Sequence, residues 1–321
     1  MNIGIIAPIP EDGTSLYRAY GPFSYISRET GAHLVTCADW GWPEIMGVDC
    51  VFMQRPFMGA HVTVARHCKV LNVPLWVDYD DLYSGFPKWL QVQEQMYSSP
   101  HALECANACV ELADVVTVST DALRCISPKA RVIPNALNSY IWPMTHRKRN
   151  KIVSWRGSGC HNGDLDSVME EMQALAAQCK EWEWHFFGAP HFKCCSFGKI
   201  HPYTDAFSFM EDFCATAPAI NVVPLVDCEF NRCKSNNAWL EATAAGALTI
   251  APDWPEWQRP GVLNYSDTKS FKYVVNEAMS MDGSVMEAKV QESRDYIREN
   301  LTLGNVNQKR IEILKGFQVK R

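Results

Sequence analysis

The stretch VVPLVDCEFNRCKSNNAWLEATAAGALTIAPDWPEW, residues 222–257, decides the fold of this chain. It opens with an apolar run, passes through a polar loop into a helical pattern, and reaches a second apolar run at Ala247. Ser235 is the predicted N-cap of the helix, and Gly246 is placed to end it. A strand, a helix and a further strand in this order predict a βαβ unit of a parallel sheet.

The start of this helix is a predicted anion site. The first N–H groups of a helix have no partner within it, the helix dipole adds positive potential, and Lys234 brings a full charge. A diphosphate would fit there, and Glu241 further along the helix would accept hydrogen bonds from a ribose diol. Lys234 and Glu241 would equally form a weak surface pair, and spacing alone does not separate these interpretations.

Outside this stretch, β-rich apolar runs alternate with helical patterns, which predicts an α/β protein with parallel sheets. The predicted strands of the first half are 3–8, 33–37, 50–53, 74–78, 114–119 and 131–134. Those of the second half are 151–155, 182–187, 219–224 and 247–251. Because the pattern breaks at 135–151, we expect two Rossmann-like domains and a terminal helix. Their expected bounds are 1–145, 146–300 and 301–321, the last packing back across the domains.

Two stretches of the second half have the apolar periodicity of helices. Asp164 is a predicted N-cap, followed by apolar residues at three- and four-residue steps that are predicted to be core. These core residues are Leu165, Val168, Met169, Met172 and Leu175. The stretch 285–317 is typical of two helices interrupted near Gly304.

Composition limits the class of protein. A chain of 321 residues with 47% hydrophobic and 21% charged residues suits two globular domains. We expect a cytoplasmic protein, because there is no apolar run of about 20 residues and no basic flank or cleavage site near the start. Thirteen scattered cysteines also favour a reducing compartment. Cys194 and Cys195 lack a second cluster at zinc-ligand spacing, so no metal site is expected.

The order of the motifs resembles that of the retaining glycosyltransferases of family 4. The resemblance is to one branch of that family, and a virus-encoded branch is compatible with it. The C-terminal motif of that branch is matched by Pro224-Leu225, Phe230-Asn231, Lys234-Ser235, Glu241 and Gly246. STDALR at 119–124, RVIPNALN at 131–138 and SWRGSGCHNGDL at 154–165 resemble further segments of the family. Together these matches cover most of the chain.

The resemblance implies the GT-B architecture, in which two Rossmann-like domains with parallel sheets face each other across a cleft. It implies that the C-terminal domain binds a nucleoside-diphosphate sugar, with a UDP-sugar favoured, and that the N-terminal domain binds the acceptor. The reaction would be hexosyl or pentosyl transfer to a hydroxyl group with retention of anomeric configuration. The nucleotide sugar is a co-substrate, and no tightly bound cofactor or metal is expected.

The residues expected to carry the chemistry fall into two groups. Arg156 and Lys234 would neutralise the leaving diphosphate, while Asp78 or Asp81 would serve as acceptor-side base or electrostatic support. The residues expected to bind the nucleotide sugar or the acceptor are Gly13, Thr14, Arg18, Gly157, Ser158, Asn231, Ser235 and Glu241. For the segment from Gly13 to Arg18, a helix-starting turn with a surface arginine is the alternative interpretation.

One position departs from the family pattern. Many members carry a glutamate eight residues before the position of Glu241, and this chain has Cys233 there. The sugar-contacting role of that glutamate would fall to Asp227, to Glu229 or to backbone amides of the same loop.

Three alternatives stay open on the sequence. Asp78 and Asp80 have the D-x-D spacing that holds magnesium or manganese in single-domain GT-A transferases. A non-catalytic nucleotide-binding relic of the same fold is the second alternative. The third concerns the acceptor, which is either an envelope or other glycan sugar or a hydroxymethylated base in phage DNA. The basic run at 146–151, interpreted as a solvated linker, is compatible with DNA, whereas the net charge of -6 is not.

Overall fold

The computed structural model describes residues 1–8, 12–37, 39–139, 141–142, 144, 148–202 and 204–319. The chain forms two compact units. The first contains residues 1–136, 228–235 and those from Leu303 onward, and the second contains 137–227 and 236–302. The expected boundary between residues 145 and 146 lies outside the described residues, as do His146 and Arg147 of the basic run.

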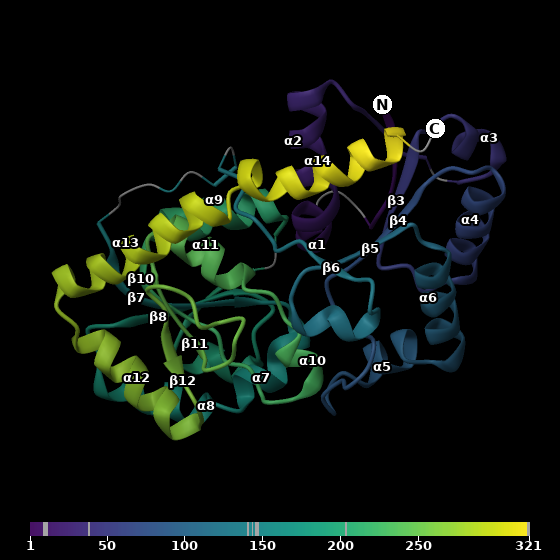
Figure 1. The fold of residues 1–321 in the computed structure, drawn as a ribbon. Coiled ribbons are helices and arrows are strands. Elements are labelled where there is room, and N and C mark those ends of the chain that lie inside the picture. Colours follow the sequence, from purple (N-terminus) through teal and green to yellow (C-terminus); the bar gives the residue numbers. More distant parts are fainter. Residues whose placement is uncertain are drawn as a thin grey trace. The chain divides into compact units, whose positions relative to one another are not determined.

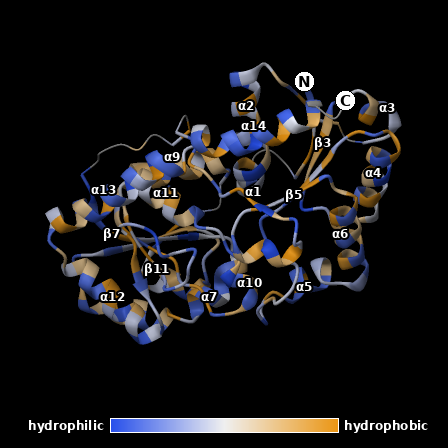
Figure 2. Ribbon diagram, viewed as in Figure 1, coloured by the Kyte–Doolittle hydropathy of each residue, from blue (hydrophilic) through white to orange (hydrophobic). Residues whose placement is uncertain are grey.

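The first unit is built on a six-stranded parallel sheet with the order β2-β1-β3-β4-β5-β6. Its strands are β1 (Asn2–Ile6), β2 (His33–Val35), β3 (Cys50–Gln54), β4 (Leu75–Tyr79), β5 (Val115–Val118) and β6 (Arg131–Val132). The six strands predicted in this half are therefore confirmed, with ends that differ by a few residues. Figure 2 shows strands β3 and β5 as largely hydrophobic, as expected for a sheet buried on both faces.

Helices cover both faces of this sheet. They are α1 (Gly13–Ser15), the π-helical segment η1 (Leu16–Tyr20), α2 (Gly21–Thr30), α3 (Trp42–Met46), α4 (Gly59–Val70), α5 (Gln91–Tyr97), α6 (Pro100–Leu112), the 3₁₀ turn η2 (Ala122–Ile126), α10 (Glu229–Arg232) and α14 (Leu303–Val319). Helices α2 and α14 lie on one face, and α4 and α6 lie on the other (Figure 1). Phe23 of α2 packs on Phe52 and Trp76 of the sheet, with ring centroids 4.7 and 5.6 Å away.

The second unit is built on another six-stranded parallel sheet, with the order β12-β11-β10-β7-β8-β9. Its strands are β7 (Asn150–Gly157), β8 (Glu183–Gly188), β9 (Lys199–Pro202), β10 (Pro218–Val222), β11 (Leu248–Pro252) and β12 (Leu263–Tyr265). Its helices are η3 (Gly159–His161), α7 (Asn162–Asp166), α8 (Met169–Gln178), η4 (Phe192–Ser196), α9 (Ala206–Thr216), α11 (Asn237–Ala245), α12 (Thr268–Ser280) and α13 (Gly283–Asn300). The four strands predicted in this half are confirmed. Strands β9 and β12 were not predicted, because they are short edge strands without a sustained apolar run.

Two predicted helix starts are wrong. Helix α11 begins at Asn237 with Asn236 at its N-cap, one residue after Ser235. Asp164 lies inside α7 instead of capping a helix, and the predicted single helix is divided into α7 and α8. In both places the tertiary hydrogen bonds of the side chain outweigh its local capping preference, as described below.

Other predictions in this unit are confirmed. Gly246 ends α11 in the left-handed conformation, with φ of 88°. The five apolar residues predicted to be core from 165 to 175 are all buried in one cluster. The two C-terminal helices are α13 and α14, and the interruption falls just before the predicted Gly304.

Candidate functional site

The strand order directs ligands to one edge of each sheet. In open α/β sheets, ligands bind at the carboxyl ends of the strands where the order reverses. That point lies between β1 and β3 in the first sheet and between β7 and β10 in the second. Gly13 and Arg18 follow β1, and Arg156 is the penultimate residue of β7. Predicted site residues therefore lie at the reversal point of each sheet.

In the first unit, Arg18 and Asp78 form a buried ion pair. The Nη2 atom of Arg18 lies 2.6 Å from one carboxylate oxygen of Asp78, and its Nε lies 2.9 Å from the other. Arg18 also donates to the carbonyl of Ile133 and to Oδ1 of Asn135, and Asp78 accepts a hydrogen bond from Thr117. With exposures of 1% and 2%, these two side chains hold strand ends together instead of facing solvent.

Lys234 joins a second charged cluster in the same unit. Its ammonium lies 2.7 Å from Asp81 and 4.1 Å from the centre of the Phe230 ring. Asp81 is also paired with Arg55, whose Nη2 lies 2.7 Å away, and Arg55 forms two further hydrogen bonds with Asp80. We name Arg55, Asp80, Asp81 and Lys234 the charge cluster. Arg55 was not identified from the sequence, because a lone arginine after a strand carries no local signal.

The segment 228–235 belongs to the first unit although it follows a strand of the second in sequence. Phe230 stacks on Phe86 with ring centroids 4.5 Å apart, and Ser235 accepts a hydrogen bond of 3.0 Å from Asn135. Thr120 donates to the carbonyl of Cys233. These contacts explain why Ser235 does not cap α11, since its hydroxyl is committed to Asn135. Asn231, another predicted site residue, is 1% exposed in this segment.

Cys233 supplies no negative charge at the position of the missing glutamate. The side chain is 4% exposed, and burial raises the pKa of its thiol to about 12. The thiol is therefore neutral near physiological pH and does not reproduce the ionic contact of a carboxylate.

In the second unit, Arg156 and Glu241 form an ion pair with a separation of 2.5 Å. The two atoms are not aligned as a hydrogen bond, so the contact is one of charge. Glu241 is 6% exposed in its side chain and Arg156 is 26% exposed. The predicted phosphate-binding cation and the predicted ribose-binding carboxylate are thus in contact with each other.

The loop that follows Arg156 is shaped by packing and by Asp164. A Cβ atom added to Gly157 would come within 2.6 Å of the Trp155 ring, so this position requires glycine. Asp164 accepts hydrogen bonds of 2.9 Å from the backbone of Val226 and contacts His161 at the same distance. Its carboxylate therefore ties this loop to the residues after β10, while Ser158 remains exposed.

Gly13 and Thr14 begin helix α1 at the carboxyl end of the first sheet. Asp12 caps this helix by accepting from the backbone of Ser15 and from the hydroxyl of Thr14. A Cβ atom added to Gly13 would meet nothing within 4 Å, so there is open space beside this backbone.

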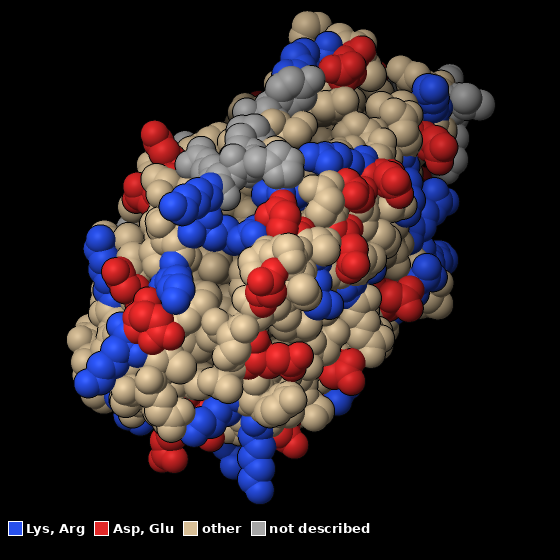
Figure 3. Space-filling view, turned by 90° about the vertical axis from the view of Figure 1, so that its left-hand side faces the viewer, with Lys and Arg blue, Asp and Glu red and all other residues tan. Residues whose placement is uncertain are grey.

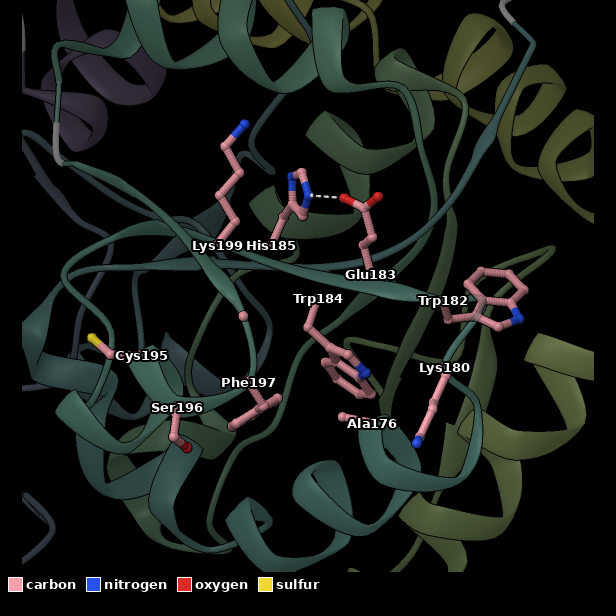
Figure 4. A pocket seen from close by; sticks show the side chains of 11 residues that line it. Ala176, Lys180, Trp182, Glu183, Trp184, His185, Cys195, Ser196, Phe197 and Lys199 are labelled. Atoms are coloured by element: carbon pink, nitrogen blue, oxygen red, sulfur yellow. Dashed lines mark hydrogen bonds and ion pairs between the residues drawn. The ribbon is translucent and has the colours of Figure 1, made fainter.

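A cavity of about 570 Å³ lies elsewhere in the second unit, near the start of β8 (Figure 4). Trp184 and Phe197 project to one side of this strand, while Glu183 and His185 project to the other and are hydrogen-bonded to each other. The lining of this cavity includes none of the predicted catalytic or ligand-binding residues.

Comparisons with known proteins give a consistent result at the level of fold. No protein-family profile matches the sequence, and no curated protein matches it. Anabaena HepE, solved in complex with UDP-glucose, is 13% identical, and the match has a TM-score of 0.69 over 98% of this chain and 100% of that chain. A UDP-forming α,α-trehalose-phosphate synthase from Burkholderia xenovorans, solved with glucose-6-phosphate, is 14% identical with a TM-score of 0.57 over 86% of this chain and 76% of that chain.

Staphylococcus aureus TarM, solved with fondaparinux, α-GlcNAc-glycerol and UDP, is 11% identical with a TM-score of 0.58 over 82% of this chain and 55% of that chain.

Two parallel sheets of six strands with this likeness define the GT-B fold, so the predicted fold class is confirmed. The alternative GT-A architecture is wrong, because the chain has two such sheets. Asp78 and Asp80, which suggested a metal site, are paired with Arg18 and Arg55.

Metal-binding clusters and membrane-spanning helices were sought among the described residues. None of their clusters of histidine, cysteine, aspartate and glutamate is arranged to hold a metal ion. In the part of the chain that the structure describes, no helix has the length and apolar character needed to cross a membrane.

Proposed function

We propose that this protein is a glycosyltransferase of the GT-B class that moves a sugar from a nucleoside-diphosphate sugar, preferably a UDP-sugar, to a hydroxyl acceptor. The observation that carries this proposal is the contact between Arg156 and Glu241 beside the reversal point of the second sheet. A guanidinium suits a diphosphate, and a buried carboxylate suits a ribose diol. Anabaena HepE, solved in complex with UDP and with UDP-glucose, supports the choice of nucleotide.

In this proposal, residues 146–300 supply the donor-binding side chains, of which residues 228–235 belong to the first compact unit. The diphosphate would draw Arg156 away from Glu241, which frees the carboxylate for the ribose. The backbone of Gly157 and Ser158 would add N–H donors to the phosphates, and Asn231 and Ser235 would complete the donor site. Lys234 and Arg156 are the two cations that we propose for the leaving diphosphate, so fixed cations would replace a metal.

Residues 1–145 would form the acceptor domain, with Gly13 and Thr14 beside open space for a sugar. Asp81 would support the acceptor side electrostatically, while Arg18 and Asp78 would act indirectly by fixing strand ends. We propose that configuration is retained, as in family 4, with the acceptor hydroxyl attacking on the face that the diphosphate leaves. The leaving phosphate would then take the proton of that hydroxyl.

A glycan hydroxyl is the acceptor that we favour. On the face drawn in Figure 3, Lys and Arg side chains are interspersed with Asp and Glu, which does not resemble a DNA-binding stripe. A hydroxymethylated DNA base is the alternative acceptor, as in virus-encoded enzymes. Steeply salt-dependent binding to modified duplex DNA would favour the DNA acceptor, and absence of binding at low salt would exclude it.

The donor site can be tested by calorimetric titration of the whole chain with UDP and GDP. Lys234→Ala and Glu241→Ala should each weaken binding about tenfold or more, because each removes a charge or acceptor that the nucleotide needs. Unchanged affinity in both variants would contradict the donor site. Lys193→Ala removes an exposed cation of the second unit and should leave the affinity unchanged.

A panel of nucleotide sugars separates an active transferase from a nucleotide-binding relic. Slow hydrolysis of one member of the panel, measured as release of nucleoside diphosphate, is the expected result. Binding without hydrolysis of any donor, with or without glycan acceptors, would favour the relic.

A further inference from the structure

Arg55 occupies an unusual position at the reversal point of the first sheet. It follows β3 directly and has a φ of 52°, a left-handed conformation that non-glycine residues seldom adopt. Its backbone N–H donates to the carbonyl of Asp78, and its own carbonyl accepts from the hydroxyl of Tyr83. Backbone strain of this kind persists only where surrounding contacts enforce it, and it is frequent at functional sites.

The side chain of Arg55 is divided between two carboxylates. Nε and Nη2 contact Asp80, and Nη2 also lies 2.7 Å from Asp81. Burial lowers the pKa of Arg55, but Asp80 and Asp81 outweigh that effect and raise it well above the ordinary value. The guanidinium therefore keeps its charge at any pH at which the protein is folded.

The charge cluster is balanced only because Arg55 is present. Asp81 lies between two cations, with Arg55 and Lys234 each 2.7 Å away. The four side chains of the cluster are between 6% and 21% exposed, so solvent screens them only partly. Within these four side chains, loss of Arg55 leaves two carboxylates and one ammonium. Arg18 also attracts Asp80, but it is itself paired with Asp78, so the surroundings of Lys234 would become more negative.

We propose that Arg55 is a positioning residue for the donor site, which neutralises Asp80 so that Lys234 and Asp81 present no net negative charge to the diphosphate. This inference rests on the proposed function, because it assigns Lys234 to the diphosphate. Arg55 acts through its neighbours and is not required to touch the ligand. Asp81 is paired with both Arg55 and Lys234. In this proposal, Asp81 thereby holds the ammonium of Lys234 in place before the donor binds.

The test uses the whole chain and UDP as the probe, titrated by calorimetry at about pH 8, because burial raises the pKa of Asp80 and a higher pH favours its ionised form. Arg55→Gln should weaken UDP binding about tenfold, because it leaves the cluster with excess negative charge. Adding Asp80→Asn in the same chain should bring the affinity back to within about threefold of the wild type, since the charge is balanced again. Arg55→Lys, which keeps the charge, should lose less affinity than Arg55→Gln.

Arg124→Gln is the matched control, because it removes an arginine paired with an aspartate in the same unit at an exposed position. It should leave UDP affinity unchanged. Equal affinity of Arg55→Gln and the wild type would overturn the inference. So would a defect that Asp80→Asn fails to relieve, since loss of packing alone would not respond to the charge of Asp80.

The two proposals fail in different ways. If the wild-type chain binds neither UDP nor GDP, the proposed function fails and the role of Arg55 falls with it. If the wild type binds UDP and Lys234→Ala weakens binding while Arg55→Gln does not, only the role of Arg55 is wrong. A thermal melt of each variant shows that the titrated protein is folded.

Discussion

At the scale of single residues, the structure separates charged side chains that hold the fold from those that remain available to a ligand. Asp78 was predicted as a catalytic residue, and it lies buried between Arg18 and Thr117. Burying one charge without its partner is strongly unfavourable, whereas a paired charge is tolerated. Asp78 therefore has a structural reason to be present that is independent of any reaction.

Asp78→Asn tests this reason directly. The substitution keeps the shape of the side chain but removes the only carboxylate that forms an ion pair with the buried guanidinium of Arg18 among the described contacts. We expect the first unit to lose about 3–5 kcal/mol of unfolding free energy, measured by urea denaturation. The exposed pair of Asp121 and Arg124 provides the comparison, and Asp121→Asn should change stability by no more than about 0.5 kcal/mol. A similar small change in Asp78→Asn would contradict the structural role.

At the scale of elements, the helix that begins at Gly13 contains a π-helical turn, η1, which leads directly into α2. The backbone N–H of Gly21 reaches the carbonyl of Leu16 across this turn. A π-turn inserts an extra residue, and such insertions are frequent at functional sites. Here the turn carries Arg18, which is buried against the ends of the neighbouring strands.

Gly21→Ala should disrupt this turn. An added Cβ atom would lie 2.2 Å from the carbonyl oxygen of Leu16, which is backbone and cannot move aside easily. We expect a loss of about 1–3 kcal/mol in unfolding free energy, as for other overpacked sites.

Gly316→Ala is the control for this prediction. Gly316 is an exposed position of α14 where the added atom meets nothing within 4 Å. The substitution should stabilise the protein by about 0.5–1 kcal/mol, since alanine favours the helix. Equal effects of the two substitutions would show that the π-turn imposes no special constraint.

At the scale of the whole molecule, the first unit is assembled from three separate parts of the chain. Helix α14 contributes apolar residues that are no more than 6% exposed, among them Val306, Ile313, Leu314 and Phe317. Asn307 of the same helix donates to the carbonyl of Pro22 in α2. The core of the first unit is therefore completed by a helix that begins 171 positions after the last strand of its sheet, since β6 ends at Val132 and α14 begins at Leu303.

A chain that stops after residue 302 should accordingly lose the cooperative unfolding of the first unit. Removing α14 exposes the face of α2 and several buried apolar side chains, each of which contributes about 1.5–3 kcal/mol when buried. Differential scanning calorimetry should then show only the transition of the second unit. A chain that stops after residue 318 keeps Phe317 and should retain both transitions. Two intact transitions in the shorter chain would show that α14 is dispensable.

The sequence by itself determined the local pattern of this protein. Alternating apolar and helical runs predicted ten of the twelve strands found among the described residues, and Gly246 marked a helix end, because these features depend on neighbours within a few residues. The order of the motifs in the sequence also identified Lys234, Arg156 and Glu241 as candidate site residues, although the sequence does not show which of them are in contact.

Only the tertiary structure decided which of these residues meet. The pairing of Arg156 with Glu241, the membership of residues 228–235 in the first unit, and the place of Arg55 beside Asp81 all depend on strand order and long-range packing. The wrong N-cap predictions at Ser235 and Asp164 have the same origin. Each side chain is hydrogen-bonded to a residue distant in sequence, Asn135 and Val226 respectively. A helix cap and a single hydrogen bond are each worth about 1 kcal/mol, so a local preference gives way where several contacts with distant segments act together.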